Sequence, residues 1–352
     1  MAGTASKGQV SRFQYAAAQG ARVAWYLGHY AAVNRLRGPL TREGEAPFTP
    51  SGPIPDRKDF VNAIRRLFER DYRNIEAGIY RAPRQTADPR ALVDKGLRFL
   101  LDARRVDERR LAKRHSEVRT AARDEDYPRY YLQNFHFQTD GWLSEDSAEI
   151  YDTQVETLFA GTADAMRRQA LVPIAAYLDG RDQRSVTLAD VGCGTGRFLY
   201  EVKRNWPRLG VTGLDLSPAY LEKTERTLRR WGRVTCLRGA AEDMPLADAS
   251  QDIVTASYLF HELPPKVRRE VMAEIARVLK PGGLFVLIDS LQTGDEPAFD
   301  GLLEFFPVAF HEPYFSTYLQ EDFGTAFAAA GLILQQVQTG YLTKVMSFEK
   351  RA

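Results

Sequence analysis

Short apolar runs alternate with helical patterns from residue 187 to the end of the chain. The apolar runs cover 187–191, 210–215, 233–238, 252–257 and 284–288. Between them, segments near 195–205, 218–231 and 265–279 repeat apolar residues at helical spacing. This alternation predicts an α/β fold with a parallel sheet. A helix at 321–330 and two strands near 332–339 and 342–348, joined at Gly340-Tyr341, complete the pattern as a hairpin.

The first half of the chain follows a helical pattern instead. Helices are expected at 10–37, from Asp56 or Asp59 onward, from Asp88 to about residue 122, and from Ser144 to Leu178. The apolar face predicted for the first of these helices consists of Phe13, Ala17, Val23, Tyr26, Leu27, Tyr30 and Val33. Five prolines in 38–58 indicate a loop. We therefore expect a helical, basic N-terminal domain at 1–143, which caps the substrate, and a second domain at 144–352.

Two segments are unusually rich in aromatic residues. The first is 127–142, and the second, 299–318, follows the fifth predicted strand. Ordinary core packing explains either one, but together they are also suited to enclosing an apolar or ring-shaped ligand. The candidate pocket residues are Tyr130, Tyr131, Phe135, His136, Trp142, Phe306, Phe310, His311 and Tyr314.

Charge is distributed unevenly in a chain of ordinary globular composition. Residues 1–130 carry 26 Lys and Arg against 16 Asp and Glu, whereas 131–352 carry 22 against 30. Solvated helix faces explain the basic half, which also suits a membrane surface, a phosphorylated substrate or nucleic acid. Trp25 and Tyr30, close to Arg22 and Arg35, make packing on a neighbouring domain and peripheral membrane contact alternative roles for the first helix.

The two cysteines, Cys193 and Cys236, provide neither a disulfide framework nor a metal-binding cluster. The first residues do not form a signal peptide, and polar residues interrupt the apolar run at 15–33. We expect a cytoplasmic protein without a metal. Nothing in the sequence specifies an oligomeric state.

A glycine-rich turn between the first predicted strand and the next helix indicates a ligand site. Gly192, Gly194 and Gly196 allow a sharp turn and leave main-chain N–H groups open to a ligand. Asp215 ends the second strand, where a carboxylate can accept hydrogen bonds from both hydroxyls of a ribose. Asp243 follows the third strand, where it can face an adenine amino group.

The residue before the turn narrows the choice of ligand. A dinucleotide requires Gly-x-Gly-x-x-Gly around its pyrophosphate, and the Asp190 carboxylate would repel that group. Here the spacing is Gly-x-Gly-x-Gly, and a carboxylate at this position suits a cationic amino group. An amino acid joined to adenosine satisfies all of these residues, so the sequence favours S-adenosyl-L-methionine.

Five motifs resemble those of the class I S-adenosylmethionine-dependent methyltransferases, in the same order and spacing. They are Asp190–Gly196, Gly213–Pro218, Gly239–Pro245, Asp252–Ser257 and Leu279–Gly283. The pattern is most similar to that of the small-molecule group that includes the ubiquinone- and menaquinone-biosynthesis enzymes, and it covers about residues 170–350. The region at 135–142 is similar to that of uncharacterised methyltransferases with a helical extension, which indicates no substrate.

The resemblance implies a Rossmann-like, doubly wound sheet of seven strands whose last hairpin is antiparallel. It also implies a set of residues that contact the cofactor. These are Asp190, Gly192, Cys193, Gly194, Gly196, Asp215, Leu216, Glu242, Asp243, Met244 and Ser257.

The expected reaction is O- or C-methylation of a small, apolar or aromatic acceptor such as a quinol, phenol or isoprenoid. His261 follows the fourth strand and is the candidate base or substrate-orienting residue, with local packing as the alternative. A dehydrogenase is disfavoured by the glycine spacing. A methyltransferase of RNA or protein would use the basic half, but nucleic acid is disfavoured because no Asn-Pro-Pro-Tyr-type motif is present. A non-catalytic binding protein or membrane-associated scaffold is the remaining alternative.

Overall fold

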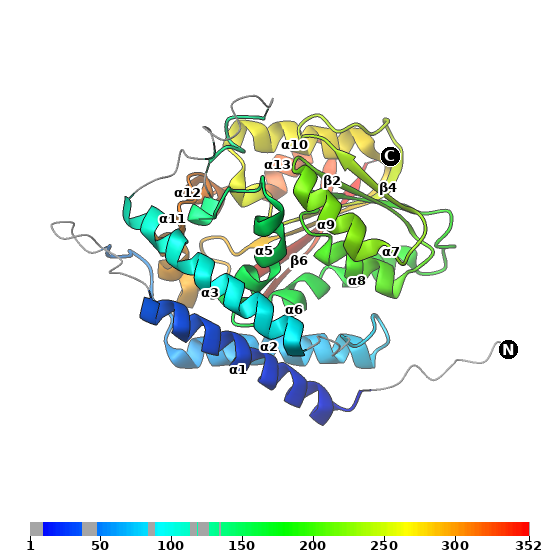
Figure 1. The fold of residues 1–352 in the computed structure, drawn as a ribbon. Helices are drawn as coiled ribbons and strands as arrows, with labels where there is room; N and C mark the ends of the chain where they lie inside the picture. Colours follow the sequence, from blue (N-terminus) through cyan, green and yellow to red (C-terminus); the bar gives the residue numbers. More distant parts are fainter. Residues whose placement is uncertain are drawn as a thin grey trace.

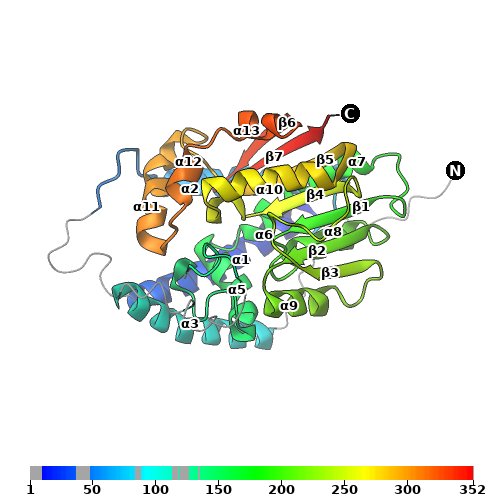
Figure 2. The same ribbon diagram turned by 90° about the horizontal axis from the view of Figure 1, so that it is seen from above.

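The computed structural model describes residues 10–36, 48–83, 89–112, 118, 127–133 and 135–351. A central sheet carries helices on both faces, and further helices from the N-terminal half lie beside it (Figures 1 and 2). The strands are β1 (Thr187–Val191), β2 (Gly210–Asp215), β3 (Val234–Arg238), β4 (Gln251–Ser257), β5 (Leu279–Ser290), β6 (Leu332–Gly340) and β7 (Thr343–Lys350).

The strand order is β3-β2-β1-β4-β5-β7-β6. Strands β1 to β5 are parallel, and β7 is antiparallel to both β5 and β6. This confirms the predicted α/β fold with seven strands and a terminal hairpin. The hairpin turn is Tyr341-Leu342 rather than Gly340-Tyr341, because Gly340 still pairs with Thr343.

The two faces of the sheet are covered by different helices. Along β5, Phe285 and Leu287 belong to one buried cluster, whereas Val286 and Ile288 belong to another. The first cluster includes α10 (Pro265–Val278) and α13 (Phe323–Ala329). The second includes α7 (Leu171–Leu178), α8 (Arg197–Asn205) and α9 (Pro218–Leu228). Side chains alternate along a strand, so the continuous apolar runs are buried on both faces.

The N-terminal half contributes α1 (Arg12–Leu36), α2 (Arg57–Glu76) and α3 (Pro89–Ala112). The second helix was predicted to begin near Asp56 or Asp59, and in the structure Asp56 is the N-cap residue of α2. The predicted cap Asp88 and most of the third helix beyond residue 112 lie outside the described residues. Among the helices of the described part of the chain, none is long and apolar enough to cross a membrane.

The prediction of one helix from Ser144 to Leu178 is wrong. Ser144 does cap α5 (Glu145–Leu158), but α6 (Ala163–Arg168) and α7 follow as separate helices. Ala160 and Gly161 adopt φ of 51° and 79°, and Gly161 N–H donates to the Glu156 carbonyl, which ends α5.

The predicted apolar face of α1 is also partly wrong. Phe13 is 82% exposed, whereas Tyr15 and Tyr26 are buried. Arg22 lies on the inner side, where its guanidinium is 2.7 Å from Glu156 and 2.9 Å from Asp164. A face defined by apolar residues does not include this arginine, which pairs with two buried carboxylates of the neighbouring helices.

A buried carboxylate on α2 joins the N-terminal helices to the rest of the fold. Asp71 accepts two hydrogen bonds from Arg168 of α6, at 3.0 and 2.6 Å. It also accepts from the hydroxyls of Tyr15 in α1 and Tyr80. Asp71 and Arg168 are both almost fully buried, so this pair fixes α1 and α2 against α6.

We expect Asp71→Ala to lower the free energy of unfolding by about 3–5 kcal/mol, because it leaves the Arg168 charge buried without a partner. Urea unfolding followed by circular dichroism measures the change. Asp94→Ala is the control, since Asp94 pairs with Arg98 at an exposed position and should cost no more than about 1 kcal/mol. Equal effects of the two substitutions would contradict the role given to Asp71.

Candidate functional site

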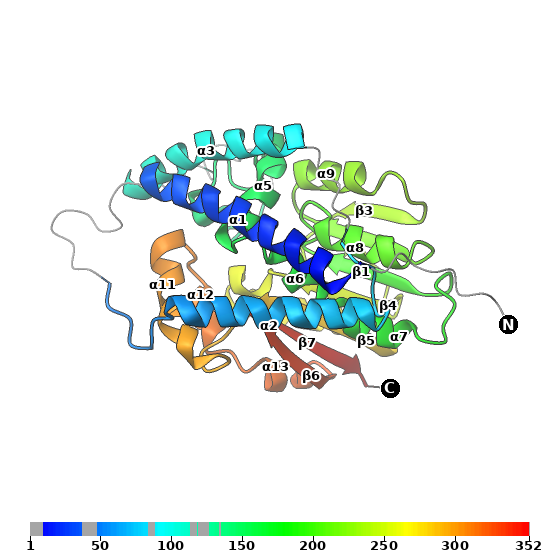
Figure 3. The same ribbon diagram turned by 90° about the horizontal axis from the view of Figure 1, so that it is seen from below.

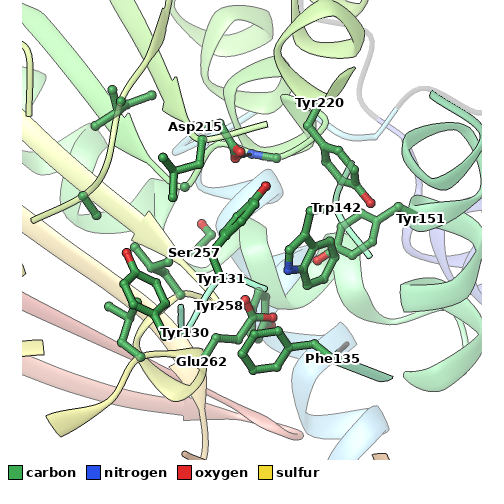
Figure 4. Close-up of a pocket in the computed structure, with 18 residues that line it drawn as sticks. Tyr130, Tyr131, Phe135, Trp142, Tyr151, Asp215, Tyr220, Ser257, Tyr258 and Glu262 are labelled. Carbon is green, nitrogen blue, oxygen red and sulfur yellow. Dashed lines mark hydrogen bonds between the residues drawn. The ribbon is translucent and has the colours of Figure 1, made fainter. Parts of the chain in front are cut away.

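A cavity opens at the carboxyl ends of β1, β2 and β4, and it is called here the glycine-loop cavity (Figure 4). It is lined by Tyr130, Tyr131, Phe135, Trp142, Tyr151, Gly192, Gly194, Leu214, Asp215, Leu216, Tyr220, Gly239, Ala241, Ser257, Tyr258, Leu259, Glu262 and Leu263. The structure therefore brings the glycine turn together with the first aromatic segment.

The glycine turn is held by the end of β2. Gly192 and Cys193 both donate their N–H groups to the Leu214 carbonyl, at 2.8 and 2.9 Å. The Asp215 carboxylate accepts from Gly194 N–H at 2.8 Å and from Ser217 N–H at 2.9 Å. Burial raises the pKa of Asp215, while these backbone hydrogen bonds oppose the rise. Asp215 is thus held rigidly at the cavity wall.

Asp190 lies behind the turn and does not line the cavity. One carboxylate oxygen accepts from the Thr255 hydroxyl at 2.6 Å, and the other has no hydrogen-bond partner among the described residues. Burial raises the pKa of this carboxyl to about 7. A buried acceptor without a partner is costly, and the ammonium group of a bound amino acid would satisfy it. The residues present therefore fit S-adenosylmethionine.

The other predicted cofactor residues divide into two groups. Leu216 and Ser257 line the cavity, whereas Cys193 and Gly196 do not. Glu242, Asp243 and Met244 also do not line it, and Gly239 and Ala241 from the same loop do.

The first aromatic segment closes the cavity from the side opposite the sheet. The Tyr130 hydroxyl donates to Glu242, at 2.7 and 2.6 Å from its two oxygens. Trp142 packs edge-to-face on Tyr151 and Tyr220, with ring centroids 5.5 and 5.8 Å apart. Figure 4 shows these rings around the cavity. Neither Tyr151 nor Tyr220 was predicted from the sequence.

A second cavity, called here the histidine cavity, adjoins the first. The two share Tyr151, Tyr258 and Glu262 in their walls. The predicted residues His136, His261, Phe306 and Phe310 line the histidine cavity, together with Glu312. Seven of the nine predicted pocket residues thus line one or the other of two adjoining cavities.

His261 is surrounded by carboxylates. Its Nδ1 lies 2.6 Å from Asp289 at the end of β5, and its Nε2 lies 3.8 Å from Glu312 and 4.0 Å from Glu262. Burial alone would lower the pKa of His261, but the negative charges of Asp289 and Glu312 raise it to about 10. At neutral pH the ring is therefore a cation, with Nδ1 bound by Asp289.

Glu312 is the carboxylate that lies across the cavity from this ring. It is almost fully buried, and one oxygen is 3.2 Å from His136 Nε2. The other oxygen has no hydrogen-bond partner among the described residues. Burial raises the pKa of Glu312 to about 7, against the opposing effect of His261. This carboxyl can consequently gain or lose a proton near neutral pH.

The two aromatic segments, which the sequence analysis expected to enclose a ligand together, are in contact. The ring centroids of His136 and Phe310 are 5.9 Å apart in a tilted arrangement, and those of Phe135 and Tyr314 are 6.4 Å apart. His311 contacts Phe137 at 5.5 Å. Neither His311 nor Tyr314 is part of the cavity lining.

Two partners of His261 were not among the predicted site residues. Asp289 lies at the carboxyl end of β5, at the same sheet edge as Asp190 and Asp215. Its position at the end of a predicted strand is the feature of the sequence that could have identified it. Glu312 was noticed only as part of an aromatic segment. No group of His, Cys, Asp and Glu among the described residues could hold a metal ion.

Comparisons with known proteins agree on one part of the chain. Residues 188–283 match a family model described as a methyltransferase domain. A malonyl-[acyl-carrier protein] O-methyltransferase of Xylella fastidiosa is 31% identical over 34% of this chain and 39% of that protein. A demethylmenaquinone methyltransferase of Thermotoga maritima is 31% identical over 42% of this chain and 60% of that protein. The chain thus spans less than two thirds of either relative.

One solved structure can serve as an example of the structural neighbours. It is 1,6-didemethyltoxoflavin-N1-methyltransferase of Burkholderia thailandensis, bound to 1,6-didemethyltoxoflavin and S-adenosylhomocysteine. The match has 19% identity and a TM-score of 0.41, and it covers 58% of this chain and 87% of that one.

We expect Asp215→Ala to weaken binding of S-adenosylmethionine by at least about a hundredfold, because each hydrogen bond to a carboxylate contributes about 1.5–3 kcal/mol. Isothermal titration calorimetry measures the affinity. Asp248→Ala is the control, since this exposed carboxylate pairs with Arg277 outside the cavity. Unchanged affinity in Asp215→Ala would remove Asp215 from the binding site.

Proposed function

We propose that this chain, which has a class I S-adenosylmethionine-dependent methyltransferase domain at residues 188–283, methylates a small acceptor bound in the histidine cavity. The observation that carries the proposal is the shared wall of the two cavities. Tyr151, Tyr258 and Glu262 belong to both, so a cofactor in one lies next to an acceptor in the other.

The cofactor has a defined set of contacts in this proposal. Asp215 holds the ribose, and Gly192 and Gly194 leave room for the methionine part, whose ammonium group would lie on the side of the buried Asp190 carboxylate behind the turn. Leu216, Gly239 and Ala241 border the adenine. When bound, S-adenosylmethionine supplies an electrophilic sulfonium methyl group.

The chain itself has to align the acceptor, exclude water and remove a proton. His261 is a cation, so we assign it the role of orienting the acceptor oxygen and stabilising its negative charge rather than that of a base. Glu312 is the group that takes the proton, because it lines the histidine cavity, its oxygen without a hydrogen-bond partner lies 3.8 Å from His261 Nε2, and its pKa of about 7 suits a base. Rings from both aromatic segments exclude water.

The acceptor in this proposal is a phenol or quinol. Its ring would pack against Phe306 and Phe310, while its hydroxyl would lie between His261 and Glu312. A methyl acceptor of this kind is small enough to lie within a cavity that the aromatic segments and α11 (Asp300–Phe310) enclose.

The activity is tested with purified protein, methyl-labelled S-adenosylmethionine and a fractionated cell extract. Mass spectrometry of the labelled product should identify a small aromatic compound that carries one added methyl group. Label found only in RNA or protein would contradict the proposed acceptor class. Cofactor binding without any labelled product would instead favour a non-catalytic binding protein.

The role proposed for Glu312 predicts how kcat depends on pH. A base acts when deprotonated, so kcat should rise as pH rises through about 7 and should fall above about 10, where His261 loses its proton. In Glu312→Gln the rise near pH 7 should disappear, and kcat should fall by about a hundredfold or more. The measurement is kcat against pH at saturating acceptor.

Two further variants separate this assignment from a structural effect. Glu304→Gln is the matched control on α11, because that carboxylate binds Ser51 instead of facing the cavity. Its pH profile should match that of the unchanged protein. A rise near pH 7 that persists in Glu312→Gln would disprove the role of this residue, and unchanged turnover in His261→Ala would remove His261 from the mechanism.

A further inference from the structure

A large cavity between α1 and α2 has no role in methyl transfer itself. Its volume is about 1340 Å³, whereas pockets for drug-sized ligands have volumes of about 300–1,000 Å³. It is called here the α1–α2 cavity. Its lining is mainly apolar and includes Leu27, Phe60, Val61, Ile64, Phe306 and Phe310.

The cavity is long as well as large. The residues that α1 contributes run from Arg12 to Asn34 and recur every three or four residues, with two adjacent pairs among them, along one face of the helix. At a rise of 1.5 Å per residue, this face extends over roughly 33 Å. Figure 3 shows α1 and α2 converging at one end and diverging at the other, where α11 lies.

The walls of this cavity are apolar, while its charged residues are exposed. Arg12, Arg57, Arg65 and Glu69 are in contact with solvent. Among the described residues, large apolar side chains of the walls are also exposed, with Leu27 at 48% and Val61 at 55%. Apolar surface that remains uncovered over such an area indicates a binding surface.

The cavity continues directly into the proposed acceptor site. Six residues line both the α1–α2 cavity and the histidine cavity: Tyr30, Asn34, Thr157, Leu158, Phe306 and Phe310. A molecule with its reactive end at His261 and Glu312 would therefore extend past Phe306 and Phe310 into the α1–α2 cavity.

We propose that the α1–α2 cavity binds a long hydrocarbon tail carried by the methyl acceptor. The position of the head group rests on the proposed function, whereas the tail site rests on the cavity alone. Tail length should determine affinity, because burial of each methylene favours binding by roughly fourfold.

Two glycines of α1 provide a matched pair of variants. A Cβ atom at Gly20 or at Gly28 would meet no atom within 4 Å, so both positions tolerate a side chain. Gly20 lines the α1–α2 cavity and Gly28 does not. Gly20→Trp should place an indole ring inside the cavity where a tail would lie, and Gly28→Trp adds the same side chain to the same helix elsewhere.

The probe is dansyl-undecanoic acid, with dansylglycine as the tailless control, and binding is followed by dansyl fluorescence. The unchanged protein and Gly28→Trp should bind the long probe and bind dansylglycine at least a hundredfold more weakly. Gly20→Trp should lose at least tenfold in affinity for the long probe, and its affinity for S-adenosylmethionine should be unchanged.

Several results would overturn the proposal. They are equal affinity for the two probes, equal binding of the long probe by both variants, and a dimer in sedimentation that Gly20→Trp dissociates without any probe binding. Tail-dependent binding by a protein that methylates no acceptor would leave the tail site standing and refute the proposed function instead. The two failures are therefore distinguishable.

Discussion

The hydrogen-bonded pair of Asp71 and Arg168 is the constraint on which the arrangement of the helices depends. Two buried charges of opposite sign stabilise a structure only when each is fully paired. Here the carboxylate also accepts from Tyr15 and Tyr80, so α1, α2 and α6 meet at one point. The floor of the α1–α2 cavity is built around this point, and Tyr15 belongs to both.

A second carboxylate extends the same principle toward the cofactor. Asp164 on α6 binds Arg22 from α1 and Arg197 from the first turn of α8. Arg197 follows directly after the glycine turn, which connects the N-terminal helices to the loop beside the cofactor site. Arg22 and Arg66 of the basic first half thus pair with carboxylates of the acidic second half, whereas Asp71 and Arg168 pair in the opposite sense.

The sheet could be predicted from the sequence far better than the site could. Alternation of strands and helices is a local pattern, and the strands after β1 lie close to where that pattern put them. The break at Ala160-Gly161 was missed because the residues on both sides favour helices and only their positive φ angles end α5. The inner face of α1 was misread because the burial of Arg22 depends on Glu156 and Asp164, which lie more than a hundred residues away.

The candidate site shows the same limit. Gly192, Gly194 and Asp215 follow a local motif and line one cavity together. The environment of His261 depends on Asp289 and Glu312, which come from the end of β5 and from the segment after α11. Asp289 lies beside His261 because β4 pairs with β5. The sequence could therefore identify His261 as a candidate residue, but not the carboxylates that keep its ring protonated.

The predicted domain boundary at residue 143 divides aromatic residues that line the same cavity. Trp142 lies before that boundary and Tyr151 after it, yet both line the glycine-loop cavity. His136 adopts φ of 56°, a left-handed conformation that is costly for a residue with a side chain, and it lies 3.2 Å from Glu312. Strain of this kind persists only where the surroundings compensate for it. The N-terminal half is therefore better regarded as one wall of the proposed active site than as an appendage to the sheet.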